Sequence, residues 1–375
     1  MPVTVLSLPH RRGNPRNSEG AFIDLADGRI LFAYTKFIGK TWSDHATAVI
    51  AARVSSDDGR TWSRRDRILI PPEGRCNVMS VSLLRLQDGT IGLFYTRKNS
   101  LNDCIPYLRK SRDEGVSWSK AVRCIPAPGY FVLNNDRVVQ LSNGRLVLPA
   151  AFHRNPKVET KTDPADFEPR ALAFFFLSDD SGHSWREARD WWPFPGRTRT
   201  GLQEPGVVEL QDGSIYSWCR TGNGRQWELR SRDHGETWSK PRPSPFHAPN
   251  SPLSIKWIPR LETYLAIWND HHPDRWTEPR RPPGTVDTSW GRTPLSAALG
   301  DPLSHQWSTP FILEDDPDSG FCYTAIHPTR DAVLLAYCCG GRGSAVLQDM
   351  RISRISLREL RKLCRTIEPI FRPPR

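Results

Sequence analysis

The stretch Ser55-Ser56-Asp57-Asp58-Gly59-Arg60-Thr61-Trp62 is the first of four copies of one pattern, Ser-x-Asp-x-Gly-x-Thr/Ser-Trp. The other copies, which we call Asp boxes together with the first, span 111–118, 178–185 and 231–238. These residue types suit a tight turn, because Ser and Asp accept hydrogen bonds from nearby backbone N–H groups and Gly allows a positive φ. The Trp side chain can then cover the turn. The recurrence along the chain indicates an array of supersecondary units.

Alternating apolar and polar stretches between the boxes predict β-hairpins. Four of them turn at Asp-Gly or Asn-Gly, the strongest short hairpin signal, at 27–28, 88–89, 143–144 and 212–213. Two weaker hairpins are predicted over 253–268 and 323–337. If each box is the turn of a second hairpin, every unit has four strands. Six such units predict an all-β fold, a six-bladed β-propeller with four-stranded antiparallel blades.

The six units use almost the whole chain, so we expect 1–375 to form a single domain. Residues 1–17 are predicted to supply the strand that closes the ring. Leucines at helical spacing predict a short C-terminal helix over 356–366. Two long segments rich in turn residues, 155–169 and 270–291, are expected to overhang a site.

Composition narrows the possible partners. The net charge is +11, but the basic residues are scattered, which fits either a solvated surface or a positive field that attracts anionic substrates. We expect no nucleic-acid partner, because no nucleic-acid motif is visible. The eight cysteines lack metal-type spacing, so we expect free thiols and neither a metal nor an organic cofactor. Neither a signal peptide nor an apolar run of membrane-spanning length is visible, which predicts a cytoplasmic protein that contacts no membrane.

Catalytic or binding residues are expected where the innermost strands begin, at the mouth of the central channel. There the sequence resembles the sialidase (neuraminidase) superfamily of six-bladed propellers, which also carry Asp boxes. Residues 203–213 read Gln-Glu-Pro-Gly-Val-Val-Glu-Leu-Gln-Asp-Gly and are followed by Arg220. The family has a similar stretch, with a Glu, a Val-Val-x-Leu strand, Asp-Gly and an Arg on the return strand. The resemblance implies that Glu204 is a base and that Arg220 binds a substrate carboxylate.

Three more roles follow from the same resemblance. Tyr323, within Gly-Phe-Cys-Tyr-Thr-Ala-Ile, would be the nucleophile, Arg292 a second carboxylate-binding residue and Asp44 the general acid. The chemistry is consistent, because a neutral Tyr avoids the repulsion between a carboxylate nucleophile and the carboxylate of a sialic acid. Arg forks bind carboxylates through paired hydrogen bonds, and a protonated Asp can donate to a leaving oxygen.

One stretch departs from the family pattern. Sialidases begin the first blade with an Arg-Ile-Pro-like motif, whose Arg completes a clamp of three arginines. Here 17–22 reads Asn-Ser-Glu-Gly-Ala-Phe, so Ser18 or Glu19 takes the Arg position and Arg16 lies two residues early. We therefore expect an incomplete clamp, in which Glu19 acts as an acid or base or binds sugar hydroxyls.

The third blade adds further candidates. Asn135 follows Asn134 and precedes Asp136, a cluster that is typical of a plain turn but could also bind sugar hydroxyls. Arg137 or His153 could recognise a charge on the sugar. Lysines that end the second strands of the first two blades would make the channel mouth basic, which fits an acidic sugar or glycan as substrate.

These features predict an exo-glycosidase of sialidase type that hydrolyses a terminal sialic acid or related acidic sugar by a retaining Tyr/Glu mechanism. Two alternatives remain open. A different propeller glycosidase or a uronate lyase could act on an acidic polysaccharide through Glu19, His153 and Tyr323. A non-catalytic carbohydrate-binding propeller is also possible, because Asp boxes occur in non-enzymatic propellers and each candidate residue could have an ordinary turn, core or ion-pair role.

Overall fold

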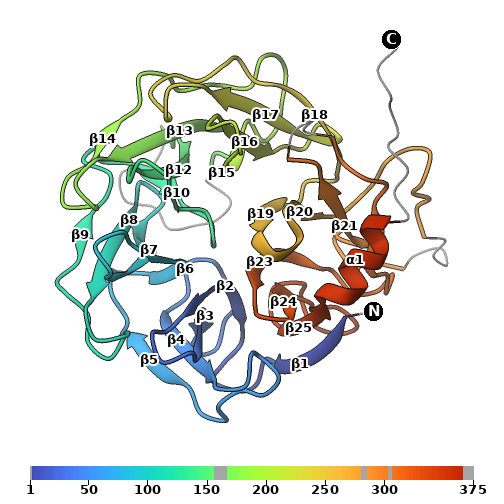
Figure 1. The fold of residues 1–375 in the computed structure, drawn as a ribbon, viewed down its shortest axis with the longest axis horizontal. Helices are drawn as coiled ribbons and strands as arrows, with labels where there is room; N and C mark the ends of the chain where they lie inside the picture. The colour runs from blue at the N-terminus through green and yellow to red at the C-terminus, as the bar shows by residue number, and fades with distance from the viewer. Residues whose placement is uncertain (1, 156–166, 280–284, 303–305, 366–375) are drawn as a thin grey trace.

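A computed structural model describes residues 2–155, 167–279, 285–302 and 306–365. The strands form a ring of six blades around a central axis (Figure 1), so the six-bladed propeller prediction is confirmed. Four blades are separate four-stranded antiparallel sheets, and the other two belong to one nine-stranded sheet.

The first three blades follow chain order from the N-terminal side. Blade 1 contains β2 (Asn17–Asp24), β3 (Ile30–Phe37), β4 (Ala48–Ser55) and β5 (Arg67–Ile70). Blade 2 contains β6 (Asn77–Arg85), β7 (Ile91–Ser100), β8 (Asp103–Ser111) and β9 (Val122–Arg123). Blade 3 contains β10 (Tyr130–Val132), β11 (Val139–Gln140), β12 (Leu146–His153), β13 (Ala171–Ser178) and β14 (Arg186–Glu187). The parallel pairing of β10 with β8 joins these last two blades into one sheet.

The remaining blades complete the ring. Blade 4 contains β15 (Gln203–Glu209), β16 (Ile215–Arg220), β17 (Arg225–Ser231) and β18 (Arg242–His247). Blade 5 contains β19 (Ser254–Ile258), β20 (Thr263–Trp268), β21 (Leu295–Gly300) and β22 (Phe311–Glu314), with the 3₁₀ turn η2 (Pro259–Leu261) between its first two strands. Blade 6 contains β23 (Cys322–Pro328), β24 (Ala332–Cys338) and β25 (Met350–Ser356). In Figure 1 the first strands β2, β6, β15, β19 and β23 surround the centre.

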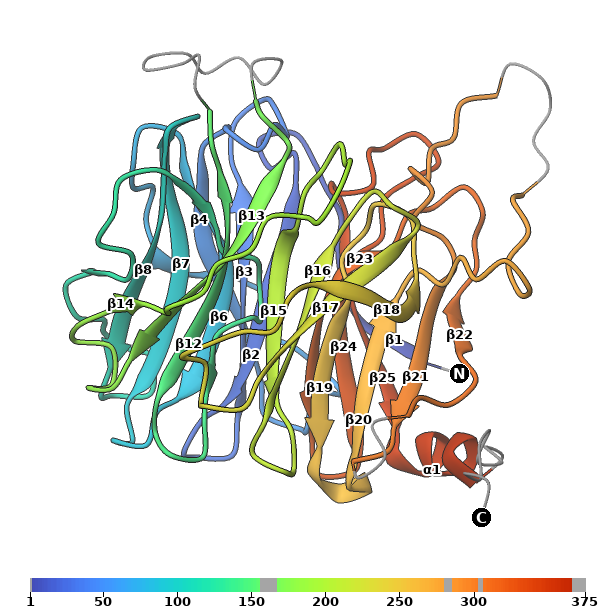
Figure 2. The same cartoon turned by 90° about the horizontal axis from the view of Figure 1, so that it is seen from above.

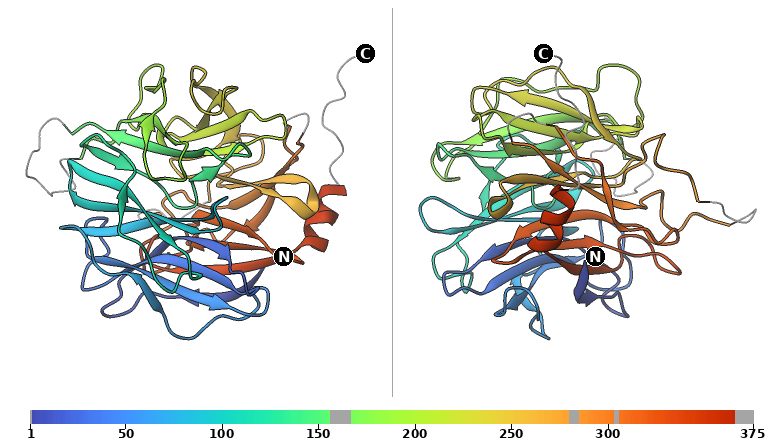
Figure 3. Two further views of the ribbon diagram at one scale, coloured as in Figure 1. Left: turned by 60° about the vertical axis from the view of Figure 1, so that its left-hand side comes forward. Right: turned by 45° about the vertical axis from the view of Figure 1, so that its right-hand side comes forward.

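The first strand of the chain closes the ring, as predicted. β1 (Val3–Leu8) pairs antiparallel with β25 and becomes the outer strand of blade 6. The predicted C-terminal helix is also present as α1 (Leu357–Arg365), which lies at the outside of the ring (Figures 2 and 3). The Ser356 hydroxyl accepts a hydrogen bond from the Glu359 backbone N–H at 3.2 Å, which caps the start of this helix. No helix in the described residues is long and apolar enough to cross a membrane.

The core is divided among the blade junctions. Six clusters of buried apolar side chains each join two neighbouring blades around the ring. The cluster between blades 6 and 1, for example, combines Phe22 and Phe32 with Leu334 and Ile352. Because each face of a blade packs on a neighbour, the ring gains its hydrophobic stability from these contacts.

The Asp boxes connect the last two strands of blades 1 to 4, and their hydrogen bonds match the expected turn. Ser55 Oγ accepts from the Gly59 N–H at 3.0 Å. The Asp57 carboxylate accepts from the Thr61 N–H at 2.8 Å and from its hydroxyl at 2.6 Å. Equivalent bonds form in the other three boxes, and all four glycines have positive φ.

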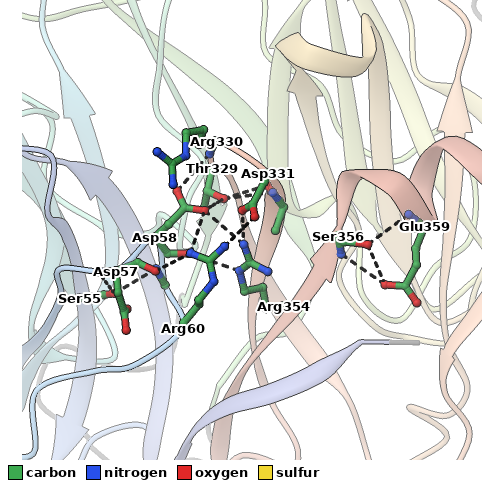
Figure 4. Close-up of polar contacts among 12 residues, drawn as sticks. Ser55, Asp57, Asp58, Arg60, Thr329, Arg330, Asp331, Arg354, Ser356 and Glu359 are labelled. Carbon is green, nitrogen blue, oxygen red and sulfur yellow. Dashed lines mark hydrogen bonds and ion pairs between the residues drawn. The ribbon is translucent and has the colours of Figure 1, made fainter.

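Each box also contacts the preceding blade. The first box packs on blade 6, where Leu334 leaves no room for a Cβ atom on Gly59. Figure 4 shows the polar contacts at this junction. Asp58 accepts hydrogen bonds from the Thr329 hydroxyl at 2.9 Å, the Arg330 N–H at 3.1 Å and the Arg354 guanidinium at 3.2 Å. The boxes are therefore structural links between blades.

Candidate active site

A cavity of about 700 Å³ opens where the innermost strands begin. Seven of the nine residues predicted for the site line this cavity, namely Tyr323, Glu204, Asp44, Arg220, Arg292, Glu19 and His153. Asp44 lines the cavity, whereas two other aspartates of blade 1 do not, because Asp57 belongs to the box and Asp24 contacts His327 at 3.0 Å. Most of the residues predicted from the sequence therefore share one cavity.

One backbone feature places several of these side chains. The pairing of the first strand with the second is interrupted near the start of blades 1, 2, 4 and 6. Inside each interruption one residue has a left-handed conformation, with φ of 54° at Glu19, 62° at Ser80, 45° at Glu204 and 58° at Tyr323. Such bulges redirect a side chain within a strand, and bulky residues adopt this conformation rarely. All four residues line the cavity.

Tyr323, Glu204 and Arg220 form one hydrogen-bonded cluster. The Tyr323 hydroxyl donates to Glu204 Oε1 at 3.0 Å, and an Arg220 N–H donates to the same oxygen at 2.8 Å. The Arg220 guanidinium also lies 3.1 Å from the Tyr323 hydroxyl oxygen. Burial and the Glu204 charge raise the pKa of Tyr323 well above its ordinary value, although Arg220 and Arg292 oppose them. Glu204 Oε2 is buried and has no hydrogen-bond partner among the described residues.

Arg292 lies beside this cluster. It precedes β21, it is buried, and its guanidinium lies 5.5 Å from the centre of the Tyr323 ring and 5.7 Å from that of Trp290. It donates to Cys322 Sγ at 3.0 Å. Burial would raise the pKa of the Cys322 thiol, but a hydrogen bond from Cys338 and the Arg292 charge lower it to about 7. This arrangement leaves Arg292 without a carboxylate partner among the described residues.

Arg16 is the residue that sequence reasoning placed incorrectly. The family motif suggested that this arginine lies too early to reach the site, but it lines the cavity and is buried. It donates to Glu19 at 3.0 Å and to Asp44 through a shorter contact. The bulge at Glu19 accounts for the difference, because an interruption in the strand pairing changes which residues face the centre. Three arginines therefore line the cavity, although Arg16 already contacts two carboxylates.

The two carboxylates on Arg16 differ in environment. The side chain of Glu19 is 4% exposed, and its second oxygen accepts a hydrogen bond from Ser80. Burial raises its pKa, although Arg16 and Ser80 oppose the shift. The side chain of Asp44 is 56% exposed. Desolvation would raise the pKa of Asp44, but the charges of Arg16 and Lys98 outweigh it and hold that pKa well below its ordinary value.

Two of the three candidate residues from blade 3 lie outside the cavity lining. Asn135 and Arg137 are buried outside the cavity lining. The Asn135 amide donates to the backbone carbonyls of Gly20 at 2.9 Å and Tyr323 at 3.2 Å, so it connects the bulged strands of blades 1 and 6. The Arg137 guanidinium lies 5.2 Å from the Trp218 ring centre, and burial lowers its pKa to about 10.

His153 does line the cavity. Its Nδ1 lies 2.9 Å from the carbonyl oxygen of Glu168, and a carbonyl only accepts, so Nδ1 carries the proton when the ring is neutral. Burial lowers the pKa of His153 to about 4.

The predicted overhanging segments are only partly described. Residues 156–166 and 280–284 lie outside the described residues. Phe167 and Trp290, which belong to the described parts of the two segments, line the cavity. Within the described residues there is no cluster of three His, Cys, Asp or Glu side chains that could hold a metal ion.

Comparisons with known proteins agree with this fold. The model of the BNR repeat-like domain family matches residues 75–335. An anhydrosialidase of Macrobdella decora is 30% identical over 164 residues, which are 40% of this chain and 19% of the relative. The match thus spans about a fifth of that protein's length.

Several solved structures superpose on most of the chain. A leech intramolecular trans-sialidase complexed with 2,7-anhydro-Neu5Ac has a TM-score of 0.69 and 15% identity, and the alignment covers 96% of this chain and 71% of that one. The Ruminococcus gnavus intramolecular trans-sialidase in complex with oseltamivir carboxylate has a TM-score of 0.69 and 15% identity, with coverages of 95% and 97%. A protein of unknown function from Dyadobacter fermentans has a TM-score of 0.69 and 17% identity, with coverages of 94% and 99%. The sialidase-like propeller fold is therefore confirmed, and identities this low show the fold alone.

Proposed function

The chain belongs to the BNR repeat-like domain family, and we propose that it is a glycoside hydrolase of sialidase type that releases a terminal sialic acid or a related acidic sugar. The observation that carries the proposal is the contact of the Tyr323 hydroxyl with Glu204 beside Arg220. A Tyr whose pKa is raised stays neutral in the free protein, so it needs an adjacent base to become a nucleophile. Glu204 is in hydrogen-bond contact with it and can accept its proton.

In the proposed first step, the Tyr323 oxygen forms a bond to the anomeric carbon while the bond to the leaving oxygen breaks. Glu204 takes the Tyr323 proton, and a general acid gives a proton to the leaving oxygen. In the second step, the deprotonated general acid takes a proton from a water that attacks the anomeric carbon from the face opposite Tyr323. The Tyr323 oxygen leaves, Glu204 returns its proton to that oxygen, and both groups are restored. Two displacements give net retention.

The positive groups suit the substrate carboxylate. Arg220 and Arg292 flank Tyr323, and a guanidinium presents donors in a fork that matches a carboxylate. Arg16 lines the same cavity and contributes a third positive charge. An acidic sugar bound here would place its anomeric carbon, which bears the carboxylate in a sialic acid, next to the Tyr323 hydroxyl.

We assign the general acid to Asp44 rather than Glu19. Asp44 is half exposed at the cavity, where the leaving group must reach solvent, whereas Glu19 is buried and both its oxygens accept hydrogen bonds. Asp44 is ionised in the free protein because of Arg16 and Lys98. A substrate carboxylate near these cations raises the pKa of Asp44 and favours the protonated form that a general acid requires.

Two of the proteins with a similar fold raise the question of which sugar product is released. Two proteins of similar fold are named intramolecular trans-sialidases, and one of these structures contains 2,7-anhydro-Neu5Ac. Product analysis by mass spectrometry therefore has to separate a free sugar acid from its anhydro form, which is lighter by one water. Either product is compatible with the same first step at Tyr323.

The test is the release of 4-methylumbelliferone from its sialic acid glycoside. We expect Tyr323→Phe and Glu204→Gln each to lower kcat/KM by at least about a hundredfold, the scale of losing a nucleophile or its base. Tyr337→Phe is the matched control, because its hydroxyl contacts Glu314 and Ser353 outside the cavity. Full activity of Tyr323→Phe would refute the proposed nucleophile. A wild-type protein that releases nothing from this glycoside, from uronic acid glycosides or from neutral glycosides would refute the hydrolase assignment.

A further inference from the structure

Two of the four cations that line the cavity form no ion pair with a carboxylate among the described residues. Four cations, Arg16, Lys98, Arg220 and Arg292, share it with the carboxylates of Glu19, Asp44 and Glu204. Arg16 contacts two of these carboxylates and Arg220 contacts the third. Arg292 and Lys98 therefore remain without a carboxylate within ion-pair distance among the described residues. In the proposed mechanism Arg292 binds the substrate carboxylate, whereas Lys98 acts only through its charge on Asp44 and contacts no part of the substrate.

Lys98 is a buried cation whose direct contacts are neutral groups. It lies near the end of β7 and is 5% exposed. Its Nζ donates to the backbone carbonyl of Asp44 at 3.2 Å and lies 5.8 Å from the centre of the Tyr130 ring. Burial raises the pKa of Tyr130, so this phenol is uncharged at neutral pH. A buried ammonium without a contacting anion costs stability, so its presence requires an explanation.

The residues around Lys98 have unused hydrogen-bonding groups. Both ring nitrogens of His45 are buried without a partner among the described residues, and so is Asn134 Oδ1. His45, His153 and Asn134 line the same cavity as Lys98, and the Lys98 charge acts on both histidines. The negative charge nearest to Lys98 belongs to Asp44, whose carboxylate is already bound by Arg16. This side of the cavity thus offers one free positive charge and an imidazole that can donate a hydrogen bond.

We infer that the substrate carries a second anionic group, a carboxylate, sulfate or phosphate, which binds Lys98 and His45 while the first carboxylate binds Arg220 and Arg292. This inference rests on the proposed function, because it places both groups on one sugar acid in the same cavity. Lys98 comes from blade 2 and Arg292 from blade 5, on opposite sides of the ring (Figure 1). The two acidic groups therefore lie at opposite ends of the bound sugar.

Inorganic phosphate tests the Lys98 site without any catalytic step. Isothermal titration calorimetry should detect two phosphate sites in the wild type. Lys98→Met should lose one of them, and Arg292→Met should lose the other. Lys110→Met is the matched control, because this lysine of the same blade contacts Asp88 at the surface, and it should retain both sites.

Thermal unfolding of the same variants separates a binding role from a structural one. The charges of Asp44 and Glu19 stabilise the Lys98 ammonium while burial opposes them, so Lys98→Met should change the melting temperature only slightly. Unchanged phosphate binding in Lys98→Met would overturn the inference, and so would a lowered melting temperature together with loss of both sites. These outcomes do not depend on hydrolysis, so failure of the sialidase proposal would be seen separately in the glycoside assay.

Substrate selectivity provides the second measurement. A set of sialic acid glycosides, each with a sulfate ester, a phosphate ester or a carboxymethyl ether on a single ring or side-chain hydroxyl, is compared with the unsubstituted glycoside. We expect one position of substitution to raise wild-type kcat/KM at least about tenfold, and Lys98→Met to abolish that gain. The preferred substituent identifies the anion. Equal gains in wild type and Lys98→Met would contradict a role for Lys98.

Discussion

The two ends of blades 1 to 4 use their polar groups differently. At the box end, Ser, Asp and Gly are joined by short hydrogen bonds, and the pKa values of Asp113 and Asp180 are lowered to about 2. At the cavity end, Glu204 Oε2 and both ring nitrogens of His45 are buried without partners among the described residues. Left-handed residues there interrupt the strand pairing, whereas in the boxes they lie within turns. Hydrogen-bonded carboxylates stabilise a fold, whereas unpartnered polar groups that line a cavity are available for binding or catalysis. The comparison therefore predicts that substitutions at the two ends affect different properties.

The largest effect should come from the cavity end. Arg292→Met removes a buried donor for the substrate carboxylate, so we expect kcat/KM to fall about a thousandfold, in line with the loss of a buried charge pair. Stability should change little, because Arg292 has no ion pair among the described residues. Steady-state kinetics and thermal unfolding measure the two effects. Arg186→Met is the control at the box end, where its partner is Glu236, and it should leave kcat/KM unchanged.

Substitutions at the box end should lower the free energy of unfolding and leave kcat/KM unchanged. Gly182 has φ of +86°, and a Cβ atom there would lie 2.3 Å from Leu108 Cδ2 of blade 2. Gly182→Ala should lower the free energy of unfolding by about 3 kcal/mol, from overpacking and backbone strain together, with normal kcat/KM for the folded fraction. Gly89→Ala separates the two causes, because Gly89 has φ of +80° but open space around it, and it should cost only about 1 kcal/mol. Equal losses in both variants would show that the contact between blades contributes nothing.

The pH dependence of kcat/KM tests whether Asp44 or Glu19 is the general acid. Because the pKa of Asp44 is held well below its ordinary value, its protonated fraction rises as pH falls. If Asp44 is the acid, kcat/KM should increase up to about tenfold for each pH unit between pH 7 and 5.5. Asp44→Asn should flatten this slope, whereas Glu19→Gln should keep it. A slope that disappears only in Glu19→Gln would transfer the role to Glu19.

The smallest effect concerns the junction shown in Figure 4. The pKa of Asp58 is lowered to about 2, although burial opposes the shift, because its carboxylate accepts several hydrogen bonds. A lowered pKa contributes stability that is present above the unfolded pKa near 4 and is lost as pH falls towards 2. Asp58→Asn should therefore cost about 1 kcal/mol at pH 7 and nothing below pH 2. Urea unfolding at both pH values measures the difference, and a cost that is the same at each pH would exclude ionisation as its source.

The fold could be predicted because its signals are local. The Asp boxes and the Asp-Gly or Asn-Gly turns each specify a turn within a few residues, and together with the two weaker hairpins over 253–268 and 323–337 they predicted six blades. Tyr323, Glu204 and Arg220 were located through a family resemblance rather than through any spacing. Their mutual contact arises from segments far apart in the chain, which no local pattern encodes.

The errors at the site arise because the sequence does not show the direction in which these side chains point. Arg16 was placed too early because a bulge changes which residues of a strand face inward, and no composition signal marks that bulge. Asn135 and Arg137 were expected to face the cavity, but they precede β11, a strand of only two residues. Without an alternating pattern of useful length, the sequence does not show which side chains turn towards the centre.

The pairing of β1 with β25 has a consequence for synthesis. Within the ring, β1 is translated before every other strand, and its partner β25 is translated after them. Until β25 is made, blade 6 is incomplete and β1 lacks the partner for its backbone hydrogen-bonding groups. Blade 1 meanwhile exposes part of the apolar face that the junction of blades 6 and 1 later covers. An open strand and an uncovered apolar surface both favour association with other chains, and the pairing of β1 with β25 removes both.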